Sequence, residues 1–299
     1  MKQANSAVSI IGVQMDLGAS LRGVNMGPLA IRFAGLAEGL EELGYHVTDL
    51  GDIQVGPPKT DNPKMKNFEP IFQANKSLHE QCLAVLKDGD TPIILGGDHG
   101  IAAGSISASA KHFKNIGVIW MDAHGDFNNE ESSPSGNMHG MPLSALTGYG
   151  PDAMVAFSDD PVYVDPKKVV LIGGRDIDRE ERKRLEVAGV NVFSIHDVDR
   201  MGMAQIIEKA LSLAGDGTEG IHVSFDMDAI TPQEAPGTGT TVHSGLTVRE
   251  AFLAAEMVAE SGKVIAVDMV EVNPMLDERN KTGHLASEMV LSFLGKAVF

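Results

Sequence analysis

The sequence has little cysteine and lacks any long hydrophobic run. Its single cysteine, Cys82, excludes a disulfide within the chain. No apolar run reaches the length of a transmembrane helix, and the sequence shows no signal-peptide pattern. These absences predict a cytoplasmic protein that does not enter a membrane. Cys82 lies in a helical pattern of apolar residues, which favours a thiol packed in the core over a reactive one.

Basic residues are also scarce. The 24 lysines and arginines stand against 41 acidic residues, which gives a formal charge of −17. A surface with this charge repels the phosphates of nucleic acids and of anionic membranes, so neither is an expected partner. Part of the negative charge would be offset if divalent cations bind to clustered carboxylates.

Short β-branched runs alternate along the chain with longer helical patterns. We expect strands at 8–13, 45–50, 91–95, 116–120, 169–172, 190–194, 221–225 and 264–270. One expected helix runs from Gly27 to Leu40, with Pro28 suited to its first turn. The region 51–68, rich in Pro, Asp and Lys, is expected to be a surface loop. This alternation predicts an α/β fold with three layers (αβα), in which helices cover both faces of a mostly parallel sheet of about eight strands. We see no domain boundary and expect a single domain over residues 1–299.

Three metal-binding side chains follow the expected strand at 116–120. Asp122, His124 and Asp126 stand at alternate positions, so they would point to one side if the chain stays extended. Open α/β sheets bind their ligands at the carboxyl ends of the strands. The segment therefore lies where a ligand site is expected.

Two other expected strands end in similar residues. The strand at 91–95 is followed by Gly96-Gly-Asp-His99, and the strand at 221–225 by Asp226-Met-Asp228. Each segment alone is better explained by a tight turn, a helix cap or polar surface than by a metal site. Together the three segments would bring two imidazoles and four carboxylates to one sheet edge, where the carboxylates would repel one another unless cations neutralise them. The combination predicts a metal site with two ions.

The type of ligand indicates the metal and the chemistry. Oxygen-rich sites with some imidazole and no thiolate suit Mn²⁺, with Mg²⁺, Co²⁺ or Fe²⁺ as competitors. A structural zinc site would require cysteines that the sequence lacks. Two cations about 3.5–4 Å apart can hold a bridging water and lower its pKa enough to supply hydroxide near neutral pH. Hydrolysis is therefore the expected reaction class.

The three motifs, Gly96-Gly-Asp-His99, Asp122-Ala-His-Gly-Asp126 and Ser224-Phe-Asp-Met-Asp228, resemble those of the ureohydrolase superfamily. Within it, Ser135-Gly-Asn-Met-His-Gly-Met-Pro142 and Val270-Glu-Val-Asn-Pro274 resemble arginase. The resemblance extends from about Val8, through Arg22-Gly-Val-Asn-Met-Gly-Pro28, to Leu294.

The resemblance implies an arginase-like fold, two Mn²⁺ ions per chain and a place in arginine metabolism and the urea cycle. The implied reaction is hydrolysis of L-arginine to L-ornithine and urea through a metal-bridging hydroxide. The resemblance further implies a homo-oligomer, either a trimer or a hexamer.

Site residues are carried over by position. The resemblance implies that His99 and Asp126 bind one manganese, that His124 and Asp228 bind the other, and that Asp122 and Asp226 touch both. The implied catalytic residues are His139 as a proton shuttle, Glu271 as an anionic seat for the guanidinium, and Asp126 as a group that helps to stabilise the tetrahedral intermediate. The implied substrate-binding residues are Asn128, Ser135 and Asn137 for the α-carboxylate, and Asp178 and Glu181 for the α-amino group.

The sequence also leaves alternatives open. Without the resemblance, His139 would be read as an ordinary loop histidine, and the Ser/Asn positions as turn residues. Four residues depart from the usual pattern of the family without being proposed metal ligands: Gly100, Asn129, Thr231 and Thr241. The competing functions are an agmatinase or another ureohydrolase of guanidino compounds, and a catalytically weak protein that binds arginine or metal.

Overall fold

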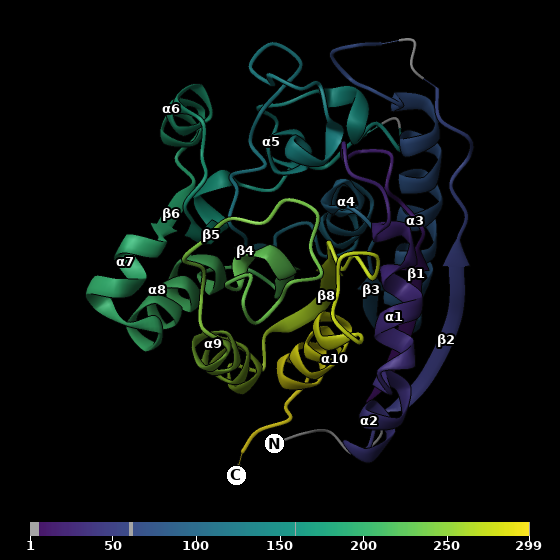
Figure 1. Cartoon of the computed structure of the whole chain (residues 1–299), viewed down its shortest axis with the longest axis vertical. Helices are drawn as coiled ribbons and strands as arrows, with labels where there is room; N and C mark the ends of the chain where they lie inside the picture. Colours follow the sequence, from purple (N-terminus) through teal and green to yellow (C-terminus); the bar gives the residue numbers. More distant parts are fainter. Residues whose placement is uncertain (1–5, 60–61, 159, 299) are drawn as a thin grey trace.

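The computed structural model describes residues 6–59, 62–158 and 160–298. They form the predicted three layers around one eight-stranded sheet (Figure 1). The strands are β1 (Ala7–Val13), β2 (His46–Ile53), β3 (Thr91–Leu95), β4 (Gly117–Met121), β5 (Val169–Gly174), β6 (Asn191–Ser194), β7 (Ile221–Asp226) and β8 (Val264–Val270). Their order is β2-β1-β3-β8-β7-β4-β5-β6, and every neighbouring pair is parallel.

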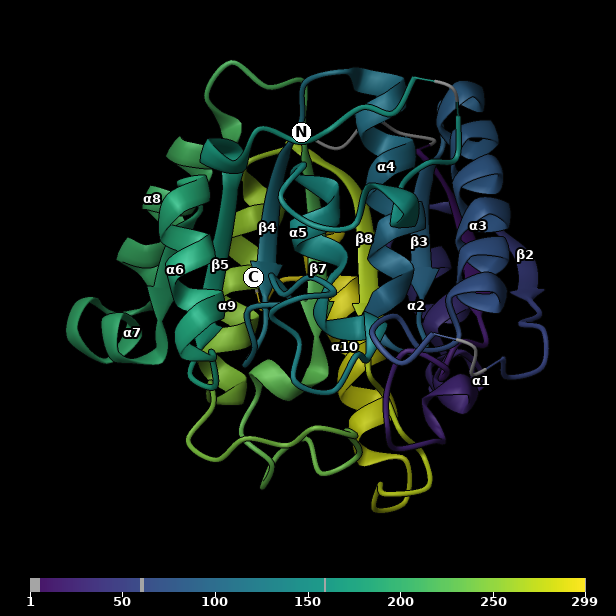
Figure 2. The same cartoon turned by 90° about the horizontal axis from the view of Figure 1, so that it is seen from above.

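Ten α-helices of the described chain cover the two faces of this sheet (Figure 2). Those on one face are α1 (Gly27–Phe33), α2 (Leu36–Glu42), α7 (Ile195–Met201), α8 (Met203–Gly215), α9 (Val248–Glu260) and α10 (Lys281–Phe293). Those on the other are α3 (Phe68–Asp88), α4 (Ala102–Phe113), α5 (Pro142–Leu146) and α6 (Arg179–Ala188). None of the described helices is long and apolar enough to cross a membrane.

The inner strands β3, β4 and β5 are almost wholly apolar because both of their faces are covered. In β3, Ile93 and Leu95 pack into one hydrophobic core, whereas Ile94 packs into the other. Successive side chains of a strand point to opposite faces, so one short run contributes to both cores. Cys82 of α3 is buried in the second core, as the sequence predicted.

The prediction of a single helix from Gly27 to Leu40 was wrong. The segment forms two helices, α1 and α2, separated at Gly35. Gly35 has a φ of 84°, the left-handed conformation that ends many helices, and its amide donates to the carbonyl of Arg32 at 3.0 Å. The turn lets Ile31 and Leu36 both reach the same core.

The strand order brings the motif-bearing strand ends together. β3, β8, β7 and β4 are neighbours, although β3 and β8 are far apart in the sequence. Leu95, Met269, Phe225 and Met121 stand in register across these four strands. The residues that follow them therefore emerge at one level of the sheet edge, where the predicted ligands lie.

Candidate metal centre and substrate site

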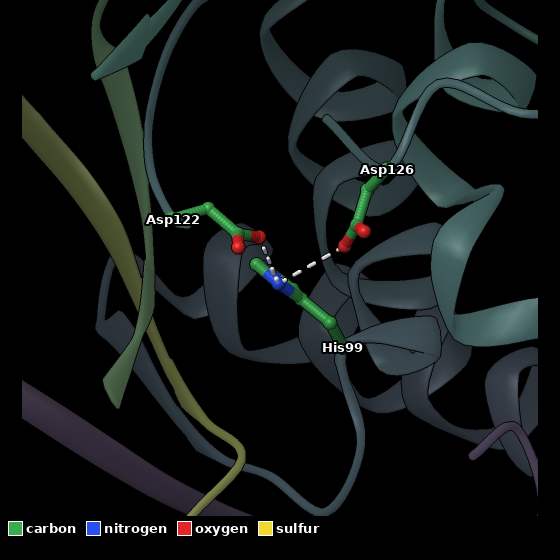
Figure 3. A group of neighbouring side chains, drawn as sticks. All are labelled: His99, Asp122 and Asp126. Atoms are coloured by element: carbon green, nitrogen blue, oxygen red, sulfur yellow. Dashed lines mark ion pairs between the residues drawn. The ribbon is translucent and has the colours of Figure 1, made fainter. Parts of the chain in front are cut away.

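A first group of metal-binding side chains consists of His99, Asp122 and Asp126 (Figure 3). His99 opens a short 3-10 helix after β3, and Asp122 follows β4 directly. The Nδ1 atom of His99 lies 3.0 Å from Asp122 Oδ2 and 3.3 Å from Asp126 Oδ2. This nitrogen is buried and has no partner with hydrogen-bond geometry. A nitrogen lone pair that faces carboxylate oxygens in this way fits a bound cation.

A second group consists of Asp122, His124 and Asp228. His124 Nδ1 lies 3.3 Å from Asp122 Oδ1 and 3.1 Å from Asp228 Oδ2. Asp122 thus presents one carboxylate oxygen to each group. Each group contains residues that the resemblance implied for one ion, without Asp226, and Asp122 belongs to both groups.

Asp226 is brought to the first group, where its Oδ2 lies 3.3 Å from His99 Nδ1. Its Oδ1 accepts the backbone amide of Asp228 at 2.7 Å. The carboxylate is thereby oriented by the same turn that carries Asp228. The expectation that Asp226 touches both ions stays a prediction.

The carboxylates of the site repel one another in the absence of cations. Burial and the charge of Asp122 raise the pKa of Asp126 well above its usual range, and burial and the charge of Asp228 do the same for Asp226. Burial also opposes ionisation of Asp122, but the close imidazoles of His124 and His99 outweigh it and lower the pKa of Asp122. Bound cations would relieve this repulsion, so the donor set fits divalent ions.

The pKa values of the two histidines are also raised. Burial acts to lower the pKa of His99, but its close contact with Asp122 and the charges of the surrounding carboxylates raise it overall. Burial likewise opposes the charged form of His124, whereas the charges of Asp228 and Asp122 raise its pKa strongly. In the metal-free protein the raised pKa values favour the protonated form of both imidazoles. A cation that binds to these nitrogens therefore has to displace a proton.

Two ligand-bearing segments depend on an unusual backbone conformation. Asp126 and Glu271 have φ values of 47° and 64°, in the left-handed region that side chains other than glycine seldom adopt. Asp126 is held there because its carbonyl accepts the amides of Leu143 and Ser144 at the start of α5. Glu271 is held because its amide donates to Gly97 O at 2.9 Å. The strain turns both carboxylates toward the site.

Other buried residues position the ring of His99. Its ring stacks on Trp120 with centroids 3.9 Å apart, and Trp120 Nε1 donates to Asp122 Oδ2 at 2.9 Å. His99 Nε2 lies 2.9 Å from Ser224 Oγ, which donates to buried Asp268. Neither Trp120 nor Asp268 was predicted from the sequence to be a site residue. A charged residue inside the otherwise apolar run Val264–Val270 is the signal that could have identified Asp268.

Glu271 and His139 form a pair beside the ligand groups. Glu271 Oε1 accepts the amide of His99 at 3.0 Å and lies 3.1 Å from His139 Nδ1. Glu271 Oε2 is buried and has no hydrogen-bond partner. Burial opposes the charged form of His139, but the hydrogen bond to Glu271 raises its pKa overall. The free oxygen can accept hydrogen bonds from a cationic substrate group.

The residues expected to bind the α-carboxylate lie on the loop between β4 and α5. Asn128 is buried, and its Oδ1 accepts the hydroxyl of Ser132 at 2.8 Å. Ser135 Oγ accepts the amide of Asn137, and Asn137 Nδ2 donates to Ser20 Oγ at 2.7 Å. The amide group of Asn128 and the hydroxyl of Ser135 remain able to donate hydrogen bonds to a carboxylate. The role of these residues in substrate binding stays a prediction.

Asp178 and Glu181 lie at the start of α6, where they form a capping box. Asp178 is exposed. Glu181 is buried, and its oxygens accept the amides of Phe127 at 2.8 Å and Asp178 at 3.3 Å. Glu181 therefore fixes the loop that follows Asp126. Contact of either carboxylate with an α-amino group stays a prediction.

The four departures from the family pattern lie outside the strands and α-helices. A Cβ on Gly100 would stand 2.8 Å from Asp98 Oδ1, which accepts the Gly100 amide, so Asp98 would have to move for any larger residue. Asn129 closes a turn through Oδ1, which accepts the amides at 131 and 132. Thr231 bonds through its amide to Leu246 O, and Thr241 is exposed.

The fold and these side chains define an α/β protein with a metal centre at the edge of a parallel sheet. Residues 6–295 match the family model described as "Arginase family". The chain is 44% identical to an arginase of Bacillus subtilis, over 98% of this chain and 99% of that protein. The chain belongs to the arginase family.

Solved structures agree with this assignment. The arginase of Bacillus caldovelox superposes with a TM-score of 0.95 at 44% identity, covering 98% of this chain and 100% of the other. The arginase of Entamoeba histolytica, solved in complex with L-ornithine, superposes with a TM-score of 0.90 at 31% identity and the same coverage. The predicted family and the predicted fold are both confirmed.

Proposed function

We propose that this protein hydrolyses L-arginine to L-ornithine and urea at a centre of two Mn²⁺ ions. The ions would be held by His99, Asp122, His124, Asp126, Asp226 and Asp228. The observation that carries the proposal is the buried, unpartnered Oε2 of Glu271 beside two ligand groups that share Asp122. The 44% identity to arginases over nearly the whole chain supports the same reaction.

A guanidinium is a resonance-stabilised cation and a poor electrophile, so the site has to supply a strong nucleophile and an anionic seat. Divalent ions, when bound, provide hydroxide near neutral pH. Glu271 offers its free oxygen to the guanidinium and orients the central carbon toward the ligand groups. Charge-assisted hydrogen bonds of this kind are roughly twice as strong as neutral ones.

The remaining steps are proton transfers by the protein. The leaving amine has to gain a proton, and His139 is a partly buried imidazole placed 3.1 Å from Glu271. We assign it the transfer of a proton to that amine and the return of a proton from replacement water. Asp126 helps to stabilise the tetrahedral intermediate.

Recognition of the substrate takes place at the other end of the pocket. Asn128, Ser135 and Asn137 bind the α-carboxylate, and Asp178 and Glu181 face the α-ammonium group. Agmatine has the guanidinium but lacks the carboxylate. A site built to bond a polar group leaves its own polar atoms unpaired when that group is missing, which disfavours the analogue by a factor of about 10⁴ or more.

The test measures urea release from L-arginine and from agmatine with Mn²⁺ present. We expect kcat/KM to favour arginine strongly, and the preference to shrink when Asn128 or Asn137 becomes Ala. Equal or better hydrolysis of agmatine by the unaltered protein would leave only the broader ureohydrolase class. Absence of urea with either substrate would favour a protein that only binds arginine or metal.

The proposal includes a cytoplasmic location and a homo-oligomer of three or six chains. Size-exclusion chromatography with light scattering measures the second of these directly.

A further inference from the structure

Arg175 makes an unusual set of contacts next to the metal centre. It follows β5, its side chain is partly buried, and its guanidinium reaches main-chain carbonyls from three segments. Nη2 donates to Asp228 O at 2.6 Å and to Val242 O at 2.9 Å, Nη1 to Ala229 O at 3.2 Å and to Gly173 O at 3.4 Å, and Nε to His243 O at 3.1 Å. Arg175 was not predicted from the sequence to be a site residue.

The backbone of Arg175 contacts the other ligand-bearing segment. The amides of Arg175 and Asp176 donate to Ala123 O at 2.8 and 3.0 Å. Ala123 stands between the ligands Asp122 and His124, and its own amide donates to Asp228 Oδ1 at 3.2 Å. Arg175 therefore joins the segment after β4 to the segment after β7, which together form the second ligand group.

The carbonyls of Val242 and His243 belong to a loop, residues 239–243. This loop contacts Asp228 of the second ligand group and also lies near Glu271. Thr240 Oγ1 donates to Asp228 Oδ2, the oxygen that faces His124, at 3.1 Å. A Cβ built on Gly239 would lie 3.8 Å from the free Oε2 of Glu271. The position of this loop thus affects both the second ligand group and the seat of the guanidinium.

The chain passes close to the Arg175 guanidinium at Gly245. A Cβ on Gly245 would stand 2.6 Å from Arg175 Nη2 and 2.7 Å from Ala229 O, so the chain has to be glycine where it passes the guanidinium. A lysine could not replace the fork, because an ammonium is a point charge and cannot span several carbonyls in one plane.

We infer that Arg175 is a positioning residue, which holds Asp228 and the 239–243 loop against His124 and so sets the affinity of the second metal ion. The inference rests on the proposed two-ion centre. The guanidinium acts through the backbone of a ligand and touches neither substrate nor metal. Its positive charge also lies close enough to Asp228, Asp122 and Asp226 to interact with their carboxylates.

The first experiment needs no metal. Hydrogen exchange is compared for the metal-free unaltered protein, Arg175→Ala, Arg175→Lys and Arg32→Ala. Arg32 is a matched control, because it is also a partly buried arginine with several bonds, but it bonds Asp49, Asp52 and Gly51 at the far edge of the sheet. We expect faster exchange over residues 228–246 in both Arg175 variants and not in Arg32→Ala.

The second experiment measures Mn²⁺ affinity by calorimetry. Loss of a group that orients a metal ligand typically weakens affinity about 10–100-fold. We expect this loss for one ion in Arg175→Ala, a smaller loss in Arg175→Lys, and none for the other ion or for Arg32→Ala. If Arg175→Ala does not fold, Gly245→Ala, which displaces the guanidinium, is expected to weaken the same ion.

The outcomes are distinguishable. An unaltered protein that binds fewer than two ions contradicts the proposed centre, whatever Arg175 does. Two ions bound with equal affinity in the unaltered protein and in Arg175→Ala overturn the positioning role while leaving the proposed function intact.

Discussion

At the scale of single residues, a variant at His139 can distinguish a role in catalysis from a role in metal binding. It lies 3.1 Å from Glu271 and belongs to neither group of metal-binding side chains found in the described residues. Replacing it with Asn should lower kcat by roughly 10²–10⁴-fold, the contribution of a positioned acid–base group. Urea production at saturating arginine, followed beside the manganese content, measures this directly.

The manganese content is the control for that variant. Because the imidazole stands outside the ligand groups, we expect the same number of ions per chain as in the unaltered protein. Loss of metal in His139→Asn would identify His139 as a ligand. Unchanged turnover would show that the proton takes another route.

At the scale of elements, the N-terminus of α6 supports the loop that follows Asp126. Glu181 caps the helix and accepts the amide of Phe127. Burial raises the pKa of Glu181 from 4.5 to about 7, against the effect of those backbone hydrogen bonds. Glu181 therefore caps α6 and holds the loop through a carboxyl group whose ionisation is opposed by burial.

The sign of the resulting pH dependence follows from linkage. The folded pKa is raised above the unfolded value, so the stability that Glu181 contributes is complete below about 4.5 and is lost as pH rises through about 7. The amide in Glu181→Gln does not titrate. We expect the Tm of the metal-free protein, relative to that variant, to fall as pH rises across this window. Parallel Tm curves for the two proteins would contradict the burial of an ionising carboxyl.

At the scale of the whole molecule, metal binding is linked to the release of protons from the ligands. His99 and His124 have raised pKa values without metal, and so do Asp126 and Asp226. Metal ligands have to be deprotonated, so Mn²⁺ binding near neutral pH should release protons and strengthen as pH rises. Calorimetry in two buffers with different heats of ionisation measures the number released. A binding heat that does not depend on the buffer would be the contrary result.

Much of the fold could be predicted because it depends on local patterns. Strands covered on both faces are rich in β-branched and other apolar residues, so the eight strands were recognisable within a few residues of their ends. Polar residues at three of those ends, such as Asp122 and His124, could be assigned to one sheet edge because parallel strands all end on the same side.

The features of the fold and site that could not be predicted depend on contacts made in the folded chain, many of them between residues far apart in the sequence. The order β3-β8-β7-β4 places Glu271 beside His99, although 172 positions separate them. The break at Gly35 depends on where α1 and α2 meet the core. Arg175 carries no sequence signal of its role, because its partners are main-chain carbonyls, which every residue possesses. Hydrophobic periodicity and side-chain chemistry specify elements and ligand types, whereas strand order and backbone contacts exist only once the chain has folded.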